Sequence, residues 1–389
     1  MALTFAKSAL TLAIGTMLAT SAVAGGFLRG TADTDILYED GPAALRTGLV
    51  YVVPSRDYDT IRGEEAHDKT FSDQYSVPFG SVKIRLFDAL SCAGTYTRPF
   101  GASTFYGPQA QLADLISTRN ATSASEFRSD EFGATCDAHV AAGPGNIHFL
   151  GGLFVQDFDY EERTTLGTLR LTDNSATGYR LGAAYDIPEY AFRAQVLFRS
   201  QIDHEADGEF ELSALGSGFA KQLTGLTFPA GTPLPTTGAG SLPKSLKVSL
   251  QSGIAPGWLA YGSVEWMDWS VLPSLNYYIE GLGPQQKNFN FRDGWTVQGG
   301  IGHSFTEKLS GTVNLTWDRG VSTGADIMSD TWTLGLGAQI KAGPGAIRLG
   351  GGLTYLTAGS QQLARGASFD AESDGDWAVG LTTSYLLKF

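Results

Sequence analysis

The chain has 389 residues, of which 49 are glycine, 11% are aromatic and only 17% are charged, and its formal net charge is −13. Length alone would allow two or three soluble domains, but this composition argues against them. The excess of acidic residues, without any cluster of Lys or Arg, argues against nucleic acid as a partner.

The first 24 residues have the pattern of a secretory signal peptide. Lys7 supplies the positive charge, residues 9–18 form the apolar run, and Ala22-Val23-Ala24 is an A-x-A cleavage site. The apolar run is shorter than the roughly 20 residues that a membrane-spanning helix needs. We therefore expect residues 1–24 to be removed and the mature chain to begin at Gly25, against the alternative of an uncleaved anchor.

Residues 25–44 do not alternate between apolar and polar side chains. A segment of this length is too long for a stray tail and too short for a domain. Two interpretations stay open from these residues alone: a disordered terminus, or a plug that folds into the lumen of the structure that follows.

From residue 45 to residue 389 the chain alternates. In 331–340, for example, apolar Trp332 and Leu334 oppose Thr331 and Thr333, and the last strand ends in Phe389. One face that meets lipid and one that meets a lumen produce this pattern, which predicts an all-β fold, a transmembrane antiparallel β-barrel of about 14 strands with a short N-terminal plug. A soluble β-sandwich is the alternative, but its strands are usually shorter. The expected strands are 46–58, 69–87, 90–105, 130–142, 147–162, 175–187, 190–205, 244–254, 258–271, 288–304, 309–319, 330–341, 346–357 and 375–389.

The connections between these strands alternate in length. Short turns are expected at 88–89, 143–146, 187–189, 255–257, 306–308 and 342–345, four of which contain Gly or Pro, and long loops are expected at 106–129, 206–243 and 358–374. Outer-membrane barrels have short periplasmic turns and long external loops.

The second long loop has an unusual apolar load, and part of 209–224 could form a short amphipathic helix. Its apolar residues could pack on the barrel rim or form a docking surface for an apolar ligand. They are Phe210, Leu212, Leu215, Phe219, Leu223, Leu226 and Phe228.

The chain has two cysteines, Cys92 and Cys136. In an exported protein such a pair predicts a disulfide, and we expect it near the periplasmic side, between adjacent antiparallel strands in staggered register. The five histidines are scattered in the sequence, so neither a metal site nor a cofactor is predicted. An enzyme is not expected either, because His303 and Ser304 alternate to opposite faces and no nucleophile motif is present.

Several segments, in order, resemble the FadL family of outer-membrane transporters for long-chain fatty acids and other hydrophobic compounds (OMPP1/FadL/TodX). The similarity is strongest over about 150 residues of the C-terminal half. The segments that carry it are Leu242-Pro243-Lys244-Ser245, residues 265–270, Phe291-Arg292-Asp293-Gly294-Trp295, residues 297–305, Trp317-Asp318 and Ser329-Asp330-Thr331-Trp332.

The N-terminal half resembles the family more loosely. Gly25, Gly26 and Phe27 are similar to its mature start, and Gly41, Pro42 and Ala43 to an Asn-Pro-Ala element of its plug, with Gly in place of Asn. The third strand contains the positions where the family has an inward kink that opens the barrel wall. Pro and Gly suit a broken strand, although an ordinary bulge is the alternative. These positions are Arg98, Pro99, Phe100, Gly101 and Ala102.

The resemblance implies passive uptake of a long-chain fatty acid or another hydrophobic small molecule. The ligand would be captured at the external loops, held above the plug and released sideways through the wall into the outer leaflet. Inward-facing basic residues such as Arg180, Arg193 and Arg199 could pair a carboxylate, but we expect lumen acids such as Asp186 and Asp318 to balance most of them. The expected surroundings are outer-membrane lipid and lipopolysaccharide, the barrel assembly machinery would insert the chain, and it would be a monomer. A general diffusion porin is the alternative function.

Overall fold

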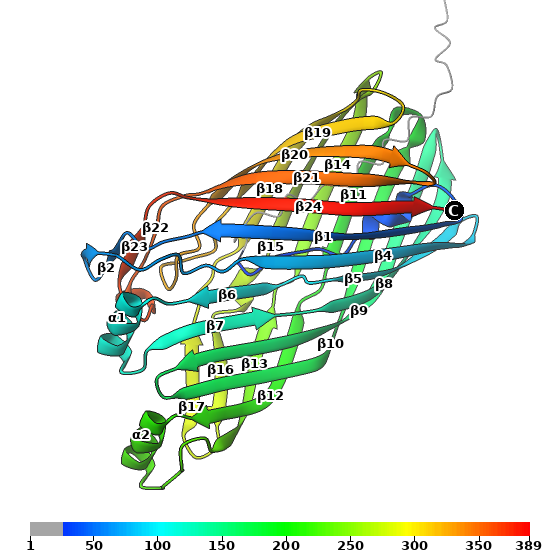
Figure 1. The fold of residues 1–389 in the computed structure, drawn as a ribbon. Helices are drawn as coiled ribbons and strands as arrows, with labels where there is room; N and C mark the ends of the chain where they lie inside the picture. Colours follow the sequence, from blue (N-terminus) through cyan, green and yellow to red (C-terminus); the bar gives the residue numbers. More distant parts are fainter. Residues whose placement is uncertain (1–25) are drawn as a thin grey trace, which may run out of the picture.

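The computed structural model describes residues 26–389, so the expected signal peptide and Gly25 lie outside the described residues. Twenty strand segments form one antiparallel sheet, and β1 pairs with both β24 and β4, which closes the sheet into a barrel (Figure 1). Six of the long strands that cross the wall are each interrupted and therefore counted as two consecutive segments: β5 with β6, β7 with β8, β11 with β12, β13 with β14, β15 with β16 and β17 with β18. The 20 segments therefore make a barrel of 14 long strands, as predicted.

The barrel segments have the following bounds: β1 (Ala43–Ser55), β4 (Tyr75–Phe87), β5 (Leu90–Thr97), β6 (Gly101–Phe105), β7 (Thr122–Arg128), β8 (Glu131–Ala142), β9 (Gly145–Thr164), β10 (Gly167–Ile187), β11 (Phe192–Arg199), β12 (Ile202–Leu212), β13 (Pro233–Leu242), β14 (Ser245–Ala255), β15 (Trp258–Met267), β16 (Ser274–Ile279), β17 (Gly283–Asn288), β18 (Gly294–Ser304), β19 (Leu309–Asp318), β20 (Thr331–Ala342), β21 (Gly345–Leu356) and β24 (Asp376–Lys388). A second, four-stranded sheet contains β2 (Thr60–Ile61), β3 (Glu64–Glu65), β22 (Gly359–Gln361) and β23 (Ala371–Ser373). The helices are α1 (Pro108–Thr118) and α2 (Ala214–Thr224), and the 3-10 turns are η1 (Thr34–Tyr38), η2 (Pro188–Tyr190), η3 (Trp269–Val271) and η4 (Leu363–Arg365).

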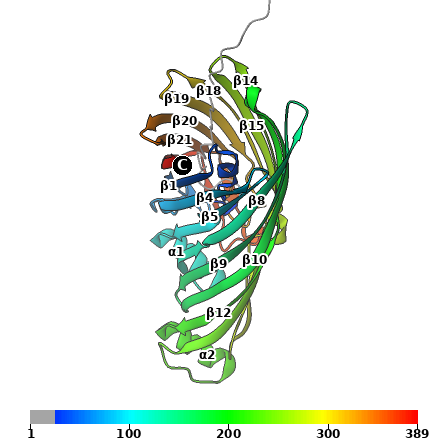
Figure 2. The same ribbon diagram turned by 90° about the vertical axis from the view of Figure 1, so that its right-hand side faces the viewer.

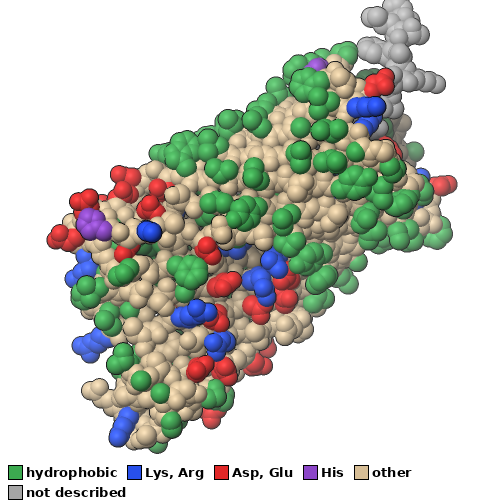
Figure 3. Space-filling view, viewed as in Figure 1, with side chains coloured by type: hydrophobic (Ala, Val, Ile, Leu, Met, Phe, Trp, Pro, Cys, Tyr) green, Lys and Arg blue, Asp and Glu red, His purple; other side chains and the backbone are tan. Residues whose placement is uncertain are grey.

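The two faces of the wall follow the alternation of the sequence. In β1, Leu49 and Tyr51 are exposed on the outside, whereas Val50 and Val52 are buried inside. The same holds in β24, where Trp377, Val379 and Leu381 point outward. Apolar side chains are spread over the outside nearest the C-terminus, and charged ones gather toward the end that carries α1 and α2 (Figure 3). Among the described residues, no helix is long and apolar enough to cross a membrane.

All six expected short turns lie at the end of the barrel where the chain ends. The opposite end carries α1, α2 and the small sheet (Figure 1). The expected loop 206–243 is wrong in part, because β12 continues to Leu212, β13 runs from Pro233 to Leu242 and only the stretch between them leaves the wall. Its helix α2 lies within the segment expected to be helical.

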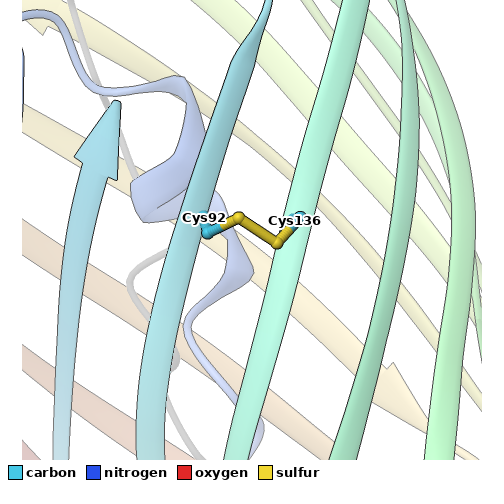
Figure 4. Close-up of a disulfide and its surroundings, with 2 residues drawn as sticks. All are labelled: Cys92 and Cys136. Atoms are coloured by element: carbon cyan, nitrogen blue, oxygen red, sulfur yellow. A yellow bond between two sulfur atoms is a disulfide. The ribbon is translucent and has the colours of Figure 1, made fainter. Parts of the chain in front are cut away.

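The disulfide joins Cys92 to Cys136, the pair expected from the sequence (Figure 4). The two cysteines are directly opposite in the β5–β8 ladder, so the expected stagger is wrong. Their neighbours Ser91, Ala93 and Thr135 are buried inside the barrel, so alternation directs the disulfide to the outer face.

Candidate functional site

Residues 26–42, here called the N-terminal segment, run inside the barrel (Figure 2). The turn η1 buries Ile36 and Leu37 against apolar residues of the inner wall: Ala44, Ala93, Leu150 and Leu386. At the end of the segment Gly41 has φ +92°, and a Cβ there would lie 2.6 Å from the carbonyl oxygen of Phe389. Only glycine allows the backbone to pass so close to Phe389, and this contact fixes where the chain enters β1, beside the C-terminus.

Acidic residues of this segment pair with basic residues of the wall. Glu39 is 3% exposed, and its carboxylate lies 2.5 Å from Arg46 Nη2, 2.6 Å from Lys388 Nζ and 3.4 Å from Arg348 Nη2. Two further pairs connect Asp33 to Arg46 at 2.5 Å and Asp35 to Arg193 at 3.0 Å. The segment is thus held by buried charges as well as by apolar contacts.

Acids of the lumen do pair with these arginines, as expected, but the two acids named from the sequence, Asp186 and Asp318, are not the ones that do so. Asp186 instead accepts hydrogen bonds from Asn146, and Asp318 accepts one from Thr296. Glu131, which is 1% exposed, balances Arg180 and Arg199, the latter at 2.8 Å. Since Arg193 is paired with Asp35, all three named candidate partners for a ligand carboxylate are already paired.

The wall is interrupted beside Pro99. The β4–β5 ladder ends at Gly80 opposite Tyr96, and contact resumes only where Ser72 bridges Thr104. The register is the same on both sides, so no residue is inserted and the break is not a bulge. Pro78 and Pro99 lie within the interrupted stretch, and both lack the N–H that a ladder requires.

The N-terminal segment pairs with the interrupted strand from inside the lumen. Arg29 and Gly30 donate their backbone N–H groups to the Pro99 carbonyl at 2.8 and 3.2 Å, and Gly101 donates to the Phe27 carbonyl at 2.9 Å. Leu28 forms an antiparallel bridge with Phe100. These contacts satisfy backbone groups that β4 would satisfy in an unbroken wall.

An outer cavity of about 550 Å³ lies between this contact and the external loops. Its floor includes Phe27, whose ring meets those of Phe127, Trp269, Phe289 and Phe291 at centroid distances of 5.4–5.8 Å. Its walls combine polar and charged residues with apolar ones, and the larger apolar side chains are Tyr58, Phe71, Phe158, Leu272, Leu275, Tyr277, Ile327 and Met328. Lys287 is paired with Glu162 there and lies 3.2 Å from the Tyr160 hydroxyl.

An inner cavity of about 170 Å³ lies on the other side of the same residues. It is lined by Glu131, Arg180 and Arg199 and by polar residues of β14 and β15. Leu28 and Arg29 line both cavities. The first residues of the N-terminal segment therefore separate the outer cavity from the inner one.

The residues expected to bind ligand are split between two places. Phe210 and Leu212 are buried in the apolar cluster that contains Phe100 and Trp269, and Phe228 packs against it. The other four are exposed on or next to α2: Leu215, Phe219, Leu223 and Leu226. None of the seven is among the described residues that line the outer cavity. Sequence reasoning named Phe27 but missed Phe127 and Phe289, which line the cavity beside it.

Comparison with known proteins gives a family match over the central part of the chain. The model of a family described as outer membrane protein transport protein (OMPP1/FadL/TodX) matches residues 132–312. Over this segment the chain is similar to that family. The matching family consists of transport proteins, in agreement with the expectation of no enzyme. No curated protein matches the sequence significantly.

Solved structures share the fold of this FadL-like barrel at low sequence identity. A Pseudomonas aeruginosa FadL homologue is 13% identical with a TM-score of 0.71, covering 94% of this chain and 96% of that one. The P. putida toluene transporter TodX is 12% identical with a TM-score of 0.62 (91% and 92% covered). The Ralstonia pickettii toluene transporter TbuX is 13% identical with a TM-score of 0.60 (91% of each chain covered).

Proposed function

We propose that this FadL-like barrel takes up hydrophobic compounds passively, with long-chain fatty acids and small aromatic hydrocarbons as the two candidate substrate classes. The observation that carries the proposal is the contact between Phe27–Gly30 and the interrupted strand at Pro99–Gly101. One short stretch of chain is at once the floor of the outer cavity and the inner cover of a break in the wall. Its movement would open both together.

The route has three steps. A ligand enters through the external loops, where the exposed apolar residues of α2 are a first contact surface, and settles in the outer cavity. A volume of about 550 Å³ is in the range of pockets that hold small organic ligands. Displacement of Phe27–Gly30, with the N-terminal segment acting as a plug, then opens the way between β4 and β5–β6 into the outer leaflet.

Physical chemistry favours the sideways exit. An acyl chain gains about 0.8 kcal/mol for each CH₂ that leaves water for an apolar environment. Charged side chains such as Glu131, Arg180 and Arg199 line part of the inner cavity, whereas the lipid beside the wall offers an apolar ligand surroundings without charge. In this proposal the protein works as a monomer in lipid and lipopolysaccharide, after export by a cleaved signal peptide and insertion by the barrel assembly machinery.

A reversible cross-link tests the required movement. Leu28 and Phe100 form an antiparallel bridge, which places Cα atoms within the range that a disulfide spans. In the double variant L28C/F100C we expect oxidation to stop uptake of labelled fatty acid or toluene into cells that lack their own channel of this kind, and reduction to restore it. The two single variants and the wild type, oxidised and reduced, control for the lost side chains and for the native disulfide.

The outcome also separates the two functions. If the oxidised double variant takes up apolar compounds at the wild-type rate, the segment does not gate the route. If the wild type conducts ions steadily in a planar bilayer and takes up small hydrophilic solutes equally well, the protein is a general diffusion porin. Mass spectrometry of apolar molecules extracted from the purified barrel would identify the substrate class.

A further inference from the structure

A group of metal-ligating side chains lies at the short-turn end of the barrel, away from both cavities. Asp137 and His139 are on β8, two residues apart and therefore on the same face of the strand. His148 on β9 is directly opposite His139 in the ladder. In the sequence these residues look unrelated, because the register that joins them is a property of the folded hairpin.

The distances between the ligand atoms fit a small tetrahedral ion. Asp137 Oδ2 lies 2.9 Å from His148 Nδ1 and 3.4 Å from His139 Nδ1. One donor atom from each of the three residues lies within 4.8 Å of the others. Bonds of about 2.0–2.1 Å in tetrahedral geometry separate neighbouring ligand atoms by roughly 3.3 Å. The observed spacing needs little adjustment to reach that geometry.

The surroundings of His148 suit a metal ligand. Its ring is buried, and its second nitrogen, Nε2, lies 3.3 Å from Asp186 Oδ1. Asp186 is itself held by the backbone N–H and the side chain of Asn146 at 3.2 and 3.0 Å. A carboxylate at the far nitrogen of a histidine fixes the tautomer and strengthens the nearer nitrogen as a ligand.

We propose that Asp137, His139 and His148 bind a divalent transition-metal ion of the zinc class, with Asp186 as the residue that positions His148. Two imidazoles and one carboxylate favour zinc, cobalt or nickel over magnesium and calcium, which prefer oxygen ligands alone. A ring contact connects this site to the N-terminal segment, since Tyr38 of η1 meets His148 at a centroid distance of 5.1 Å. The ion would fasten β8 to β9 directly beneath the segment.

Metal titration tests the site. The full-length barrel, without a histidine tag, is stripped with a chelator and titrated with Zn²⁺, and bound metal is measured by elemental mass spectrometry. We expect one equivalent for the wild type and a loss of affinity on the order of a hundredfold or more for H148Q and for H139Q. D186N should lose roughly ten- to a hundredfold. H303Q, which removes a histidine whose ring contacts that of Trp258, is the matched control and should bind as the wild type does.

A second measurement protects the result against misfolded variants. Co²⁺ added to the wild-type barrel should give the intense visible absorption of tetrahedral coordination, which Zn²⁺ then displaces. Heat-modifiable migration on gels shows which variants are folded. The proposal is overturned if the wild type binds no stoichiometric Zn²⁺ and gives no such spectrum, or if folded H139Q and H148Q bind Zn²⁺ as tightly as the wild type. In either case Asp137 only forms ion pairs with the two imidazoles.

Discussion

Glu39 is the residue through which the buried charges of the N-terminal segment can be tested. Its carboxylate faces Arg46, Lys388 and Arg348, and its carbonyl accepts a hydrogen bond from Lys83. The substitution E39Q keeps the shape of the side chain and removes the negative charge. We expect E39Q to loosen the segment without unfolding the barrel, because Glu39 precedes the first strand and takes no part in the ladder.

The size of the effect follows from burial. Removing one partner of a buried ion pair costs about 3–5 kcal/mol, because the remaining charge stays out of water. The Arg46 and Arg348 side chains are only 5% and 7% exposed, so neither can recover its hydration without moving. Since each 1.4 kcal/mol changes an equilibrium tenfold, the released population should rise between roughly a hundredfold and a few thousandfold. Arg46 keeps its pair with Asp33 at 2.5 Å, and glutamine can still accept one hydrogen bond, so we expect the lower end of this range.

Thiol labelling measures that population. Thr34 is 5% exposed, and both native cysteines are in the disulfide, so the variant T34C offers one reactive thiol that is reached only when the segment leaves its site. The rate of maleimide labelling is compared between T34C and T34C/E39Q. D40N is the matched control, because Asp40 is exposed and lies 3.9 Å from Lys388. Equal labelling rates in the E39Q and D40N backgrounds would refute the idea that buried charge holds the segment.

Three further predictions use other contacts. F27A removes the ring that meets four aromatic neighbours, at a packing cost of about 3 kcal/mol, and should join the two cavities, giving a larger single-channel conductance in planar bilayers than the wild type or L215A shows. Burial raises the pKa of Asp326, in the external loop between β19 and β20, to about 7. Between about pH 4 and pH 7 the carboxyl of Asp326 is therefore protonated in the folded loop but ionised in the unfolded chain. The free energy of unfolding of the loop should fall as the pH rises through this range. Amide exchange of residues 319–330 should be slower at pH 5 than at pH 8 after correction for intrinsic rates, and D326N should abolish that difference. C92S/C136S opens a cross-link between residues 44 apart and should cost about 4 kcal/mol, seen as faster unfolding in urea, whereas reductant should not speed unfolding of the double variant further.

The barrel was predictable from sequence wherever its outer face meets lipid, because that contact requires the alternation of apolar and polar residues. The prediction fails in the outer half of β12, beyond residue 205, where Ala206, Phe210 and Leu212 point inward and Asp207 and Glu211 outward. Inward and outward side chains still alternate there, but the outward-facing side chains are acidic instead of apolar. Such a face belongs in water or among polar headgroups, so the strand has left the hydrocarbon layer and reads as a loop.

The site was less predictable than the barrel. Composition and resemblance pointed to the N-terminal segment and to Pro99, but not to the bridge between Leu28 and Phe100. That bridge joins positions far apart in the chain and leaves no periodic pattern. Similarly, the four exposed apolar residues around α2 and the buried Phe210 have the same hydrophobicity, and only the fold decides which of them reaches the cavity cluster.

The length of the strands determines where a ligand first meets the membrane. β9 and β10 contain 20 and 21 residues, which at about 3.3 Å per residue span roughly 65 Å along the strand. With a tilt of about 45° this is a height of roughly 45 Å, against about 30 Å of hydrocarbon. The external part of the barrel therefore extends beyond the hydrocarbon layer into the sugar layer that surrounds the cell. A hydrophobic molecule that enters at the external opening crosses that layer inside the barrel lumen. It reaches the membrane only where the wall is interrupted.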